Sequence, residues 1–104
     1  MKESELQKTI IDYLTIRGHL VKRNNAGKMF GEHKGKKWAV NIGEAGWNDI
    51  LGVEKGTGRF IGVEVKIRPN KPTTLQQEKI DQINKLGGLS FVAYSLQDVI
   101  DRGL

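Results

Sequence analysis

The sequence predicts one α/β domain in which helices cover both faces of a central sheet. Its 104 residues suit one hydrophobic core and leave no room for a second conventional domain. Hydrophobic residues make up 38% of the chain and charged residues 28%, a balance typical of globular proteins. Helix-like and strand-like segments follow in the order helix, several strands, helix, strand, helix. A sheet between helices buries the apolar sides of all these elements.

The first element is predicted to be a helix over residues 4–17. Ser4 and Gln7 have the spacing of a capping box, and Gly18 provides a stop. Apolar residues recur between them at helical spacing: Leu6, Ile10, Tyr13 and Leu14.

The middle of the chain is predicted to be mostly strand. Residues 19–23 are short and partly apolar, which favours a strand, whereas residues 24–35 are rich in Gly, Asn and Lys, as loops are. A further strand is predicted over residues 37–42. The segments WNDILGV and FIGVEVKI, separated by the turn-like EKGTGR, predict two strands joined in a hairpin.

The last third is predicted to hold a helix, a strand and a short final helix. Thr73 and Gln76 repeat the capping-box spacing ahead of a helical apolar pattern, which paired glycines from Gly87 terminate. Residues 89–94 form a short apolar strand, and Ser95 caps a final helical turn.

Composition restricts the location of the protein and the metals that it could bind. No apolar run approaches the ~20 residues that cross a bilayer, and the first residues lack a signal-peptide pattern, so we expect a cytoplasmic protein. Cysteine is absent, which excludes disulfides and thiolate zinc sites. Any metal would be held by carboxylates, carbonyls or the two histidines, which favours hard ions such as Mg²⁺.

Positive charge is concentrated in one segment. Seventeen basic residues oppose twelve acidic ones, for a formal charge of +5. Between residues 22 and 37 only Glu32 opposes a cluster of basic residues: Lys22, Arg23, Lys28, Lys34, Lys36 and Lys37. A basic, glycine-containing stretch suits a phosphate backbone, because neutralising phosphates releases counterions. A solvated lysine-rich loop without a ligand explains the charge equally well.

The segment FIGVEVKI carries the strongest chemical signal. Strand alternation places Glu64 and Lys66 on one face with Gly62, opposite a row of aliphatic residues. Gly62 suits the close approach of a ligand or another backbone. Burial of such charges without a partner is costly, so they either face solvent or have a function. The alternative is an amphipathic edge strand that carries a surface ion pair.

Asp49 adds a second carboxylate, because it opens the preceding strand of the predicted hairpin. Asp49 and Glu64 together would form the oxygen-rich pocket that Mg²⁺ prefers, where a water can become the nucleophile that attacks a phosphodiester. Lys66 would hold or help deprotonate that water and offset charge in the transition state. Taken alone, Asp49 is as readily a turn aspartate.

The histidines and tryptophans have ordinary explanations. His19 and His33 fit a strand start and a loop, since no second histidine lies at ligand spacing. Trp38 and Trp47 are better explained as core or sheet-face residues than as platforms for stacked bases.

These motifs resemble the VRR-NUC family of PD-(D/E)xK nucleases, which are found in phages, bacteria and eukaryotic DNA-repair enzymes. The resemblance rests on GWND at 46–49, VEVK at 63–66, helical Glu5 and Gln76, and the basic RNNAGK stretch. It spans nearly the whole chain and is strongest for stand-alone phage or prophage members. It implies a restriction-endonuclease-like α/β/α sandwich with a central mixed β-sheet. One departure is Asn48, where the family often has proline before the aspartate.

The resemblance also implies roles for individual residues. Asp49 and Glu64 would bind the metal, the backbone carbonyl of Val65 would be a further ligand, and Lys66 would be the catalytic lysine.

Two helical residues would complete this site. Glu5 would approach the metal from the first helix, and Gln76 would orient the site from the second. Both also have simpler explanations, as a first-turn glutamate and a capping residue. Nucleic-acid contacts are expected from the basic stretch: Lys22, Arg23, Asn25, Lys28, Lys34, Lys36 and Lys37.

The sequence therefore leads us to expect a single nuclease domain over residues 1–104, dependent on Mg²⁺ or Mn²⁺, that hydrolyses DNA. The resemblance further implies a homodimer acting on branched DNA such as four-way (Holliday) junctions, in a bacterial or phage-infected host cell. Two alternatives stay open: a non-catalytic nucleic-acid-binding module that uses the same positive surface, and a nuclease acting on RNA.

Overall fold

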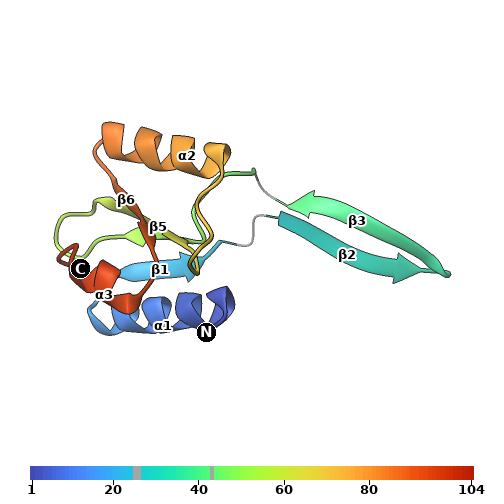
Figure 1. The fold of residues 1–104 in the computed structure, drawn as a ribbon, viewed down its shortest axis with the longest axis horizontal. Coiled ribbons are helices and arrows are strands. Elements are labelled where there is room, and N and C mark those ends of the chain that lie inside the picture. The colour runs from blue at the N-terminus through green and yellow to red at the C-terminus, as the bar shows by residue number, and fades with distance from the viewer. Residues whose placement is uncertain (25–26, 43) are drawn as a thin grey trace.

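A computed structural model describes residues 1–24, 27–42 and 44–104, except for the side chains of 27–30, 38 and 40–42. Its elements run in the expected order of helix, several strands, helix, strand, helix (Figure 1). Their bounds are α1 (Glu3–Ile16), β1 (Leu20–Arg23), β2 (Gly27–His33), β3 (Lys36–Ile42), β4 (Ile50–Val53), β5 (Phe60–Val65), α2 (Thr74–Lys85), β6 (Leu89–Ala93) and α3 (Leu96–Ile100).

The central sheet is mixed, and helices cover both of its faces. Its strand order is β1-β4-β5-β6, with antiparallel pairing except between β5 and β6, which are parallel. Helices α1 and α3 lie on one face and α2 on the other (Figure 1). The expected α/β architecture with a mixed central sheet is therefore confirmed. None of the helices within the described residues is both long enough and apolar enough to span a bilayer.

The hydrophobic core lies between the sheet and the face carrying α1 and α3. Helix α1 buries the apolar positions that its spacing predicted: Leu6, Ile10 and Leu14. They pack with three fully buried residues of β5, which confirms the predicted alternation along that strand: Ile61, Val63 and Val65. Burial of one such aliphatic side chain stabilises the fold by about 1.5–3 kcal/mol.

The start of α1 differs from the prediction. The helix begins at Glu3, and its N-cap, Lys2, has no side-chain capping hydrogen bond. The Lys2 carbonyl accepts the first helical hydrogen bonds, from the N–H of Glu5 and of Leu6, both at 3.1 Å. Ser4 therefore already lies inside the helix, and the predicted capping box at Ser4 is wrong.

The start of α2 matches the prediction. Thr73 is the N-cap, and its Oγ1 accepts a hydrogen bond from the Gln76 N–H at 3.2 Å. The Gln76 Oε1 in turn accepts from the Thr73 N–H at 2.9 Å. This reciprocal pair satisfies two backbone donors that the helix itself leaves free.

A hairpin formed by β2 and β3, called the arm below, is the largest departure from the sequence prediction. Residues 27–33 were predicted as loop, but β2 pairs antiparallel with β3, from Gly27 opposite Ile42 to His33 opposite Lys36. Positive φ at Lys34 (50°) and Gly35 (75°) makes the tight turn that matches strand twist. The Gly, Asn and Lys content of this segment is typical of a loop, but its strand structure comes from pairing with β3 and not from an apolar pattern of its own.

The arm gives the molecule an elongated shape (Figure 1). The principal extents are 50 × 29 × 27 Å, and the radius of gyration is 14.9 Å. A compact domain of about 100 residues has a radius of gyration of ~13 Å. The remaining elements, α1, β1, β4, β5, α2, β6 and α3, form what we call the body.

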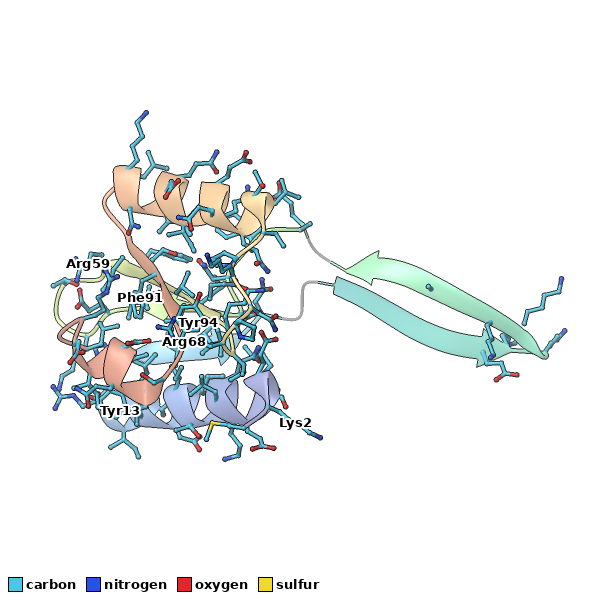
Figure 2. The ribbon with its side chains drawn as sticks, in the orientation of Figure 1. Lys2, Tyr13, Arg59, Arg68, Phe91 and Tyr94 are labelled. Atoms are coloured by element: carbon cyan, nitrogen blue, oxygen red, sulfur yellow. The ribbon has the colours of Figure 1, made fainter. Side chains whose placement is uncertain are left out.

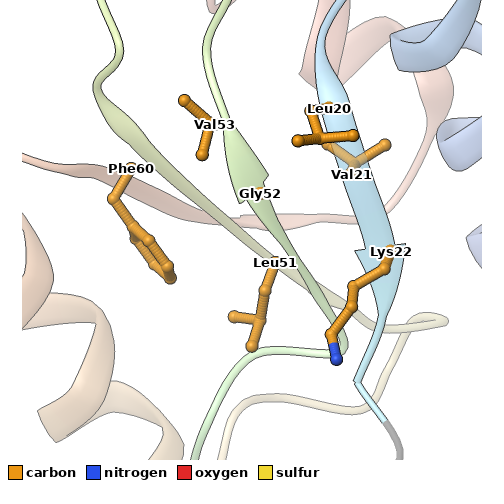
Figure 3. A pocket seen from close by; sticks show the side chains of 7 residues that line it. All are labelled: Leu20, Val21, Lys22, Leu51, Gly52, Val53 and Phe60. Atoms are coloured by element: carbon orange, nitrogen blue, oxygen red, sulfur yellow. The ribbon is translucent and has the colours of Figure 1, made fainter.

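Helix α2 packs against β5 and β6 and leaves the β1–β4 part of its face open. A shallow groove of about 370 Å³ lies there, with almost entirely apolar walls (Figure 3). Its lining residues are Leu20, Val21, Lys22, Leu51, Gly52, Val53 and Phe60. Leu20 is 76% exposed and Val53 43% exposed, so the body presents an uncovered apolar surface on the same face as α2.

Candidate active site

The β4–β5 hairpin positions the three predicted catalytic residues. Asp49 immediately precedes β4, Glu64 lies near the end of β5, and Lys66 directly follows β5. Strand β5 is flanked by β4 and β6, and the Glu64 side chain is only 1% exposed. The alternative of an edge strand with a surface ion pair is therefore wrong.

The side chains of these residues converge at the end of β5. The carboxylate of Asp49 accepts a hydrogen bond from the Val65 N–H at 2.8 Å. The ammonium of Lys66 lies 3.9 Å from Oε1 of Glu64. Burial first, and the neighbouring charge of Asp49 second, together raise the pKa of Glu64 to about 8, whereas Lys66 opposes the shift. The two carboxyl groups are thus neighbours, as the sequence predicted.

One oxygen of this pair has no partner. Oε2 of Glu64 is buried and forms no hydrogen bond within the described part of the chain. A buried carboxylate oxygen without a partner is costly, and a bound cation would supply the missing interaction. Two adjacent carboxylates fit Mg²⁺, which typically takes few protein ligands and keeps several waters.

The acidic group at this site is small. Among the described residues, no group of three or more His, Asp or Glu side chains is arranged to hold an ion. Asp49 and Glu64 are therefore the two carboxylates that the structure brings together, and the Val65 carbonyl stays a predicted further ligand.

Helix α1 brings a different glutamate towards the site from the one that the sequence suggested. Glu3 is partly buried, and its charge contributes to the raised pKa of Glu64. Glu5 is exposed, and its role as a metal ligand remains a prediction. Glu3 lies three residues before the buried Leu6, so helical spacing alone could have placed it on the inward side of α1.

Helix α2 holds Gln76 through the capping box. Its Oε1 is engaged with the Thr73 N–H, and the residue is partly buried. The predicted second role of Gln76, orienting the metal site, stays a prediction.

The space above Gly62 is filled by a neighbouring side chain. A Cβ at Gly62 would collide with Oδ1 of Asn48 and would come within 3.2 Å of the Ser90 hydroxyl. Gly62 was predicted to admit a ligand or another backbone, and this is wrong, because it admits the Asn48 side chain. A signal for this contact was present in the sequence, because Asn48 stands where the VRR-NUC family often has proline.

An arginine holds the chain that follows Lys66. The guanidinium of Arg68 stacks over the ring of Tyr94, 4.1 Å from its centroid (Figure 2). Tyr94 directly follows β6, as Lys66 follows β5, and the Lys66 N–H donates to the Ala93 carbonyl at 3.1 Å. The end of β5 that carries Glu64 is therefore fastened to β6 and the residue after it, at Lys66 and at Arg68.

The basic residues divide between β1 and the arm. Lys22 and Arg23 are exposed on β1, and Lys34, Lys36 and Lys37 are exposed at the turn of the arm and on β3. Asn25 and the side chain of Lys28 lie outside the described residues.

The start of the arm is tied to the candidate site. The Asn24 N–H donates to the Asp49 carbonyl at 2.7 Å, and Nδ2 of Asn24 donates to the Asn48 carbonyl at 3.1 Å. The chain thus leaves β1 for the arm beside the residues that present Asp49.

Trp47 and His19 take part in structural contacts. Trp47 lies edge-on to Phe60, with ring centroids 6.4 Å apart, and its Nε1 donates to Glu44 at 2.7 Å. His19 accepts a hydrogen bond through Nδ1 from the Lys55 N–H at 2.9 Å. His33 is exposed on the arm, in β2 and not in a loop. The side chain of Trp38 lies outside the described residues.

No protein-family model matches this chain, and no curated protein sequence matches it. The chemistry of Asp49, Glu64 and Lys66, together with the positive arm, is therefore the basis for assigning a function.

Proposed function

We propose that this protein is a metal-dependent endonuclease that hydrolyses DNA phosphodiester bonds, with the restriction-endonuclease-like fold of the VRR-NUC family. The observation that carries this proposal is the buried Glu64, whose Oε2 has no partner among the described residues while Asp49 and Lys66 lie beside it. Buried polar atoms in folded proteins are nearly always hydrogen-bonded. An oxygen that lacks a protein partner in such a setting suits a divalent cation.

Asp49 and Glu64 would hold Mg²⁺ or Mn²⁺, together with the Val65 carbonyl. Such an ion, when bound, lowers the pKa of water and stabilises the charge that develops on a phosphate. Asp49 keeps a fixed orientation because the Val65 N–H holds its carboxylate at 2.8 Å. Lys66 can offer its ammonium to the phosphate or to the attacking water, and its proximity to Glu64 restricts its position.

The arm and β1 would contact the phosphate backbone. Lys34, Lys36 and Lys37 are exposed at the outer part of the arm, while Lys22 and Arg23 are exposed on β1. Lysines on a projecting hairpin can follow a polyphosphate without sequence preference. The choice of DNA over RNA follows from the resemblance to the VRR-NUC nucleases.

We also propose that the protein acts as a homodimer on branched DNA such as four-way junctions. The uncovered apolar groove on β1 and β4 supports a protein contact, because contiguous exposed apolar surface commonly marks an interface. A two-fold dimer could present two sites to two strands of a junction.

The test is a cleavage assay with linear duplex, single-stranded and four-way-junction DNA and with RNA, in Mg²⁺, in Mn²⁺ and in EDTA. We expect DNA to be cut in either metal, junctions best, and no cutting in EDTA. Glu64→Gln and Lys66→Ala should abolish cleavage while DNA binding persists. Lys8→Ala, which removes an exposed lysine of α1, is the matched control and should cut normally.

Each alternative has its own outcome in this assay. Salt-sensitive DNA binding without cleavage of any substrate would contradict the enzyme and leave a nucleic-acid-binding module. Preferential cleavage of RNA would change the proposed substrate from DNA to RNA and would leave the proposed catalytic residues unchanged.

A further inference from the structure

Asn48 is a buried polar residue directly before Asp49. It has no exposed surface, and the chain bends at Asp49 before entering β4. Its Oδ1 accepts a hydrogen bond from the Ser90 hydroxyl at 3.1 Å and lies against Gly62. Its side chain therefore reaches across β5, where only a glycine leaves room for it.

The contacts of Asn48 continue to α2. Asn84 of α2 holds both backbone groups of Ser90, accepting from its N–H and donating to its carbonyl, each at 2.8 Å. Ser90 is also the strand partner of Gly62 in the β5–β6 pair. A chain of polar contacts thus runs from α2 through β6 to the residue that precedes Asp49.

The backbone at Asn48 and Asp49 is also held by Asn24, which directly follows β1. The carbonyls of both residues accept hydrogen bonds from Asn24, at 3.1 Å to Asn48 and 2.7 Å to Asp49. Asn24 thus holds the two carbonyls, and Ser90 holds the Asn48 side chain, so both contacts restrain the backbone that presents Asp49.

Packing alone does not account for an amide at this position. Nδ2 of Asn48 is buried without a partner among the described residues. An apolar residue would fill the space over Gly62 without leaving a buried donor unsatisfied. An amide is useful here because its oxygen accepts a hydrogen bond from Ser90 and so connects the bend before β4 to β6.

We propose that Asn48 is a positioning residue of the candidate site. Its side chain, held over Gly62 and bonded to Ser90, sets the bend that aims the Asp49 carboxylate at the Val65 N–H and at Glu64. This inference rests on the proposed function for its catalytic meaning. Its structural content, the orientation of Asp49, can be measured without metal or DNA.

The first measurement is amide hydrogen exchange by NMR in metal-free protein. The Val65 N–H reports the Asp49 carboxylate directly, whereas the adjacent Lys66 N–H bonds to the Ala93 carbonyl and serves as an internal reference. In Asn48→Ala we expect Val65 exchange to accelerate at least tenfold more than Lys66 exchange. Equal acceleration of both amides, or of neither, would overturn the inference.

The second measurement is Mn²⁺ binding by isothermal titration calorimetry. Loss of a residue that orients a metal ligand typically weakens metal affinity by about 10–100-fold, and we expect a loss of this size in Asn48→Ala. Asn70→Ala, at an exposed turn position, is the control and should bind as the wild type does. Unchanged affinity in Asn48→Ala would count against the inference.

A milder variant covers the case in which Asn48→Ala does not fold. Ser90→Ala removes only the hydroxyl that holds Oδ1 of Asn48, and it should shift both readouts in the same direction by a smaller factor. If the wild type binds no Mn²⁺ but the Val65 amide responds selectively, the proposed function fails while the positioning role of Asn48 holds.

Discussion

The body and the arm of this protein differ in what holds them together. The body buries aliphatic side chains of α1 and β5 in a core, and its central strand carries a carboxylate that is 1% exposed. In the arm, β2 and β3 pair only with each other, as a two-stranded sheet. An isolated two-stranded hairpin is at best marginally stable in water. A carboxyl group with a raised pKa, such as Glu64, requires burial, and the body provides it. Contact with phosphates requires only exposed positive charge, which the arm provides.

The largest expected effect would follow from removing one carboxylate of the body. Asp49→Asn keeps an oxygen that can accept from the Val65 N–H but removes the negative charge. We expect cleavage of DNA to fall at least about 100-fold, because charge stabilisation at the reacting phosphate is lost. DNA affinity, measured by fluorescence anisotropy, should stay close to that of the wild type. If Asp49→Asn still cuts DNA at the wild-type rate, the negative charge of Asp49 is not needed for cleavage.

The next effect should come from the arm and should affect binding, not chemistry. In the triple variant K34A/K36A/K37A, each lysine that contacts phosphate should make the slope of log K against log salt less negative by about 0.9. The melting temperature should not change, since these residues are exposed. Anisotropy titrations across a range of salt concentrations check both the slope and the affinity.

A control with body lysines sharpens this comparison. Lys8 and Lys85 are exposed on α1 and α2, and the variant K8A/K85A removes charge from the body alone. If it weakens DNA binding as much as the arm variant, the arm has no special part in binding.

The stability of the metal-free body should depend on pH through Glu64. Burial first, and Asp49 second, raise its pKa from 4.5 to about 8, so the folded state holds the proton more tightly than the unfolded state. The unfolding free energy should therefore decrease as the pH rises from about 4.5 to about 8 and level off above that.

Glu64→Gln isolates this effect because it cannot titrate. At pH 8 in EDTA its melting temperature should exceed that of the wild type by at least about 4 °C, since ~1 kcal/mol shifts the melting temperature of so small a domain by ~4–8 °C. The difference should shrink towards pH 5. Parallel wild-type and variant curves across this range would show that Glu64 does not titrate in the range proposed.

The smallest expected effects concern the two helix starts of the body. Thr73→Ala should lower the free energy of unfolding by ~1 kcal/mol, because it removes a capping hydrogen bond of α2. Ser4→Ala should change it by less than ~0.5 kcal/mol, because Ser4 has no capping role. Urea denaturation measures both, and equal losses would contradict the assigned start of α1.

Local patterns predicted the parts of the fold that neighbours along the chain define. The buried face of α1, the alternation along β5, the β4–β5 hairpin and the capping box at Thr73 all follow from side chains a few residues apart. The convergence of Asp49, Glu64 and Lys66 was predictable for the same reason, because one hairpin carries all three.

The errors occurred where the partner is distant in sequence. Strand β2 was missed because pairing with β3 defines it, and Gly62 was misread because Asn48 packs over it. Glu3 was overlooked although it lies three residues before the buried Leu6, on the inward side of α1, where its charge raises the pKa of Glu64.

By itself the sequence determined the α/β order, the apolar faces and the three residues of the candidate site, since helical and strand periodicities are local properties of the chain. Only the tertiary structure decided that Glu64 is buried in a central strand with an unpartnered oxygen, and that Asn48 is held between Gly62 and Ser90. Burial and partnership depend on which distant segments meet, and no local pattern encodes that.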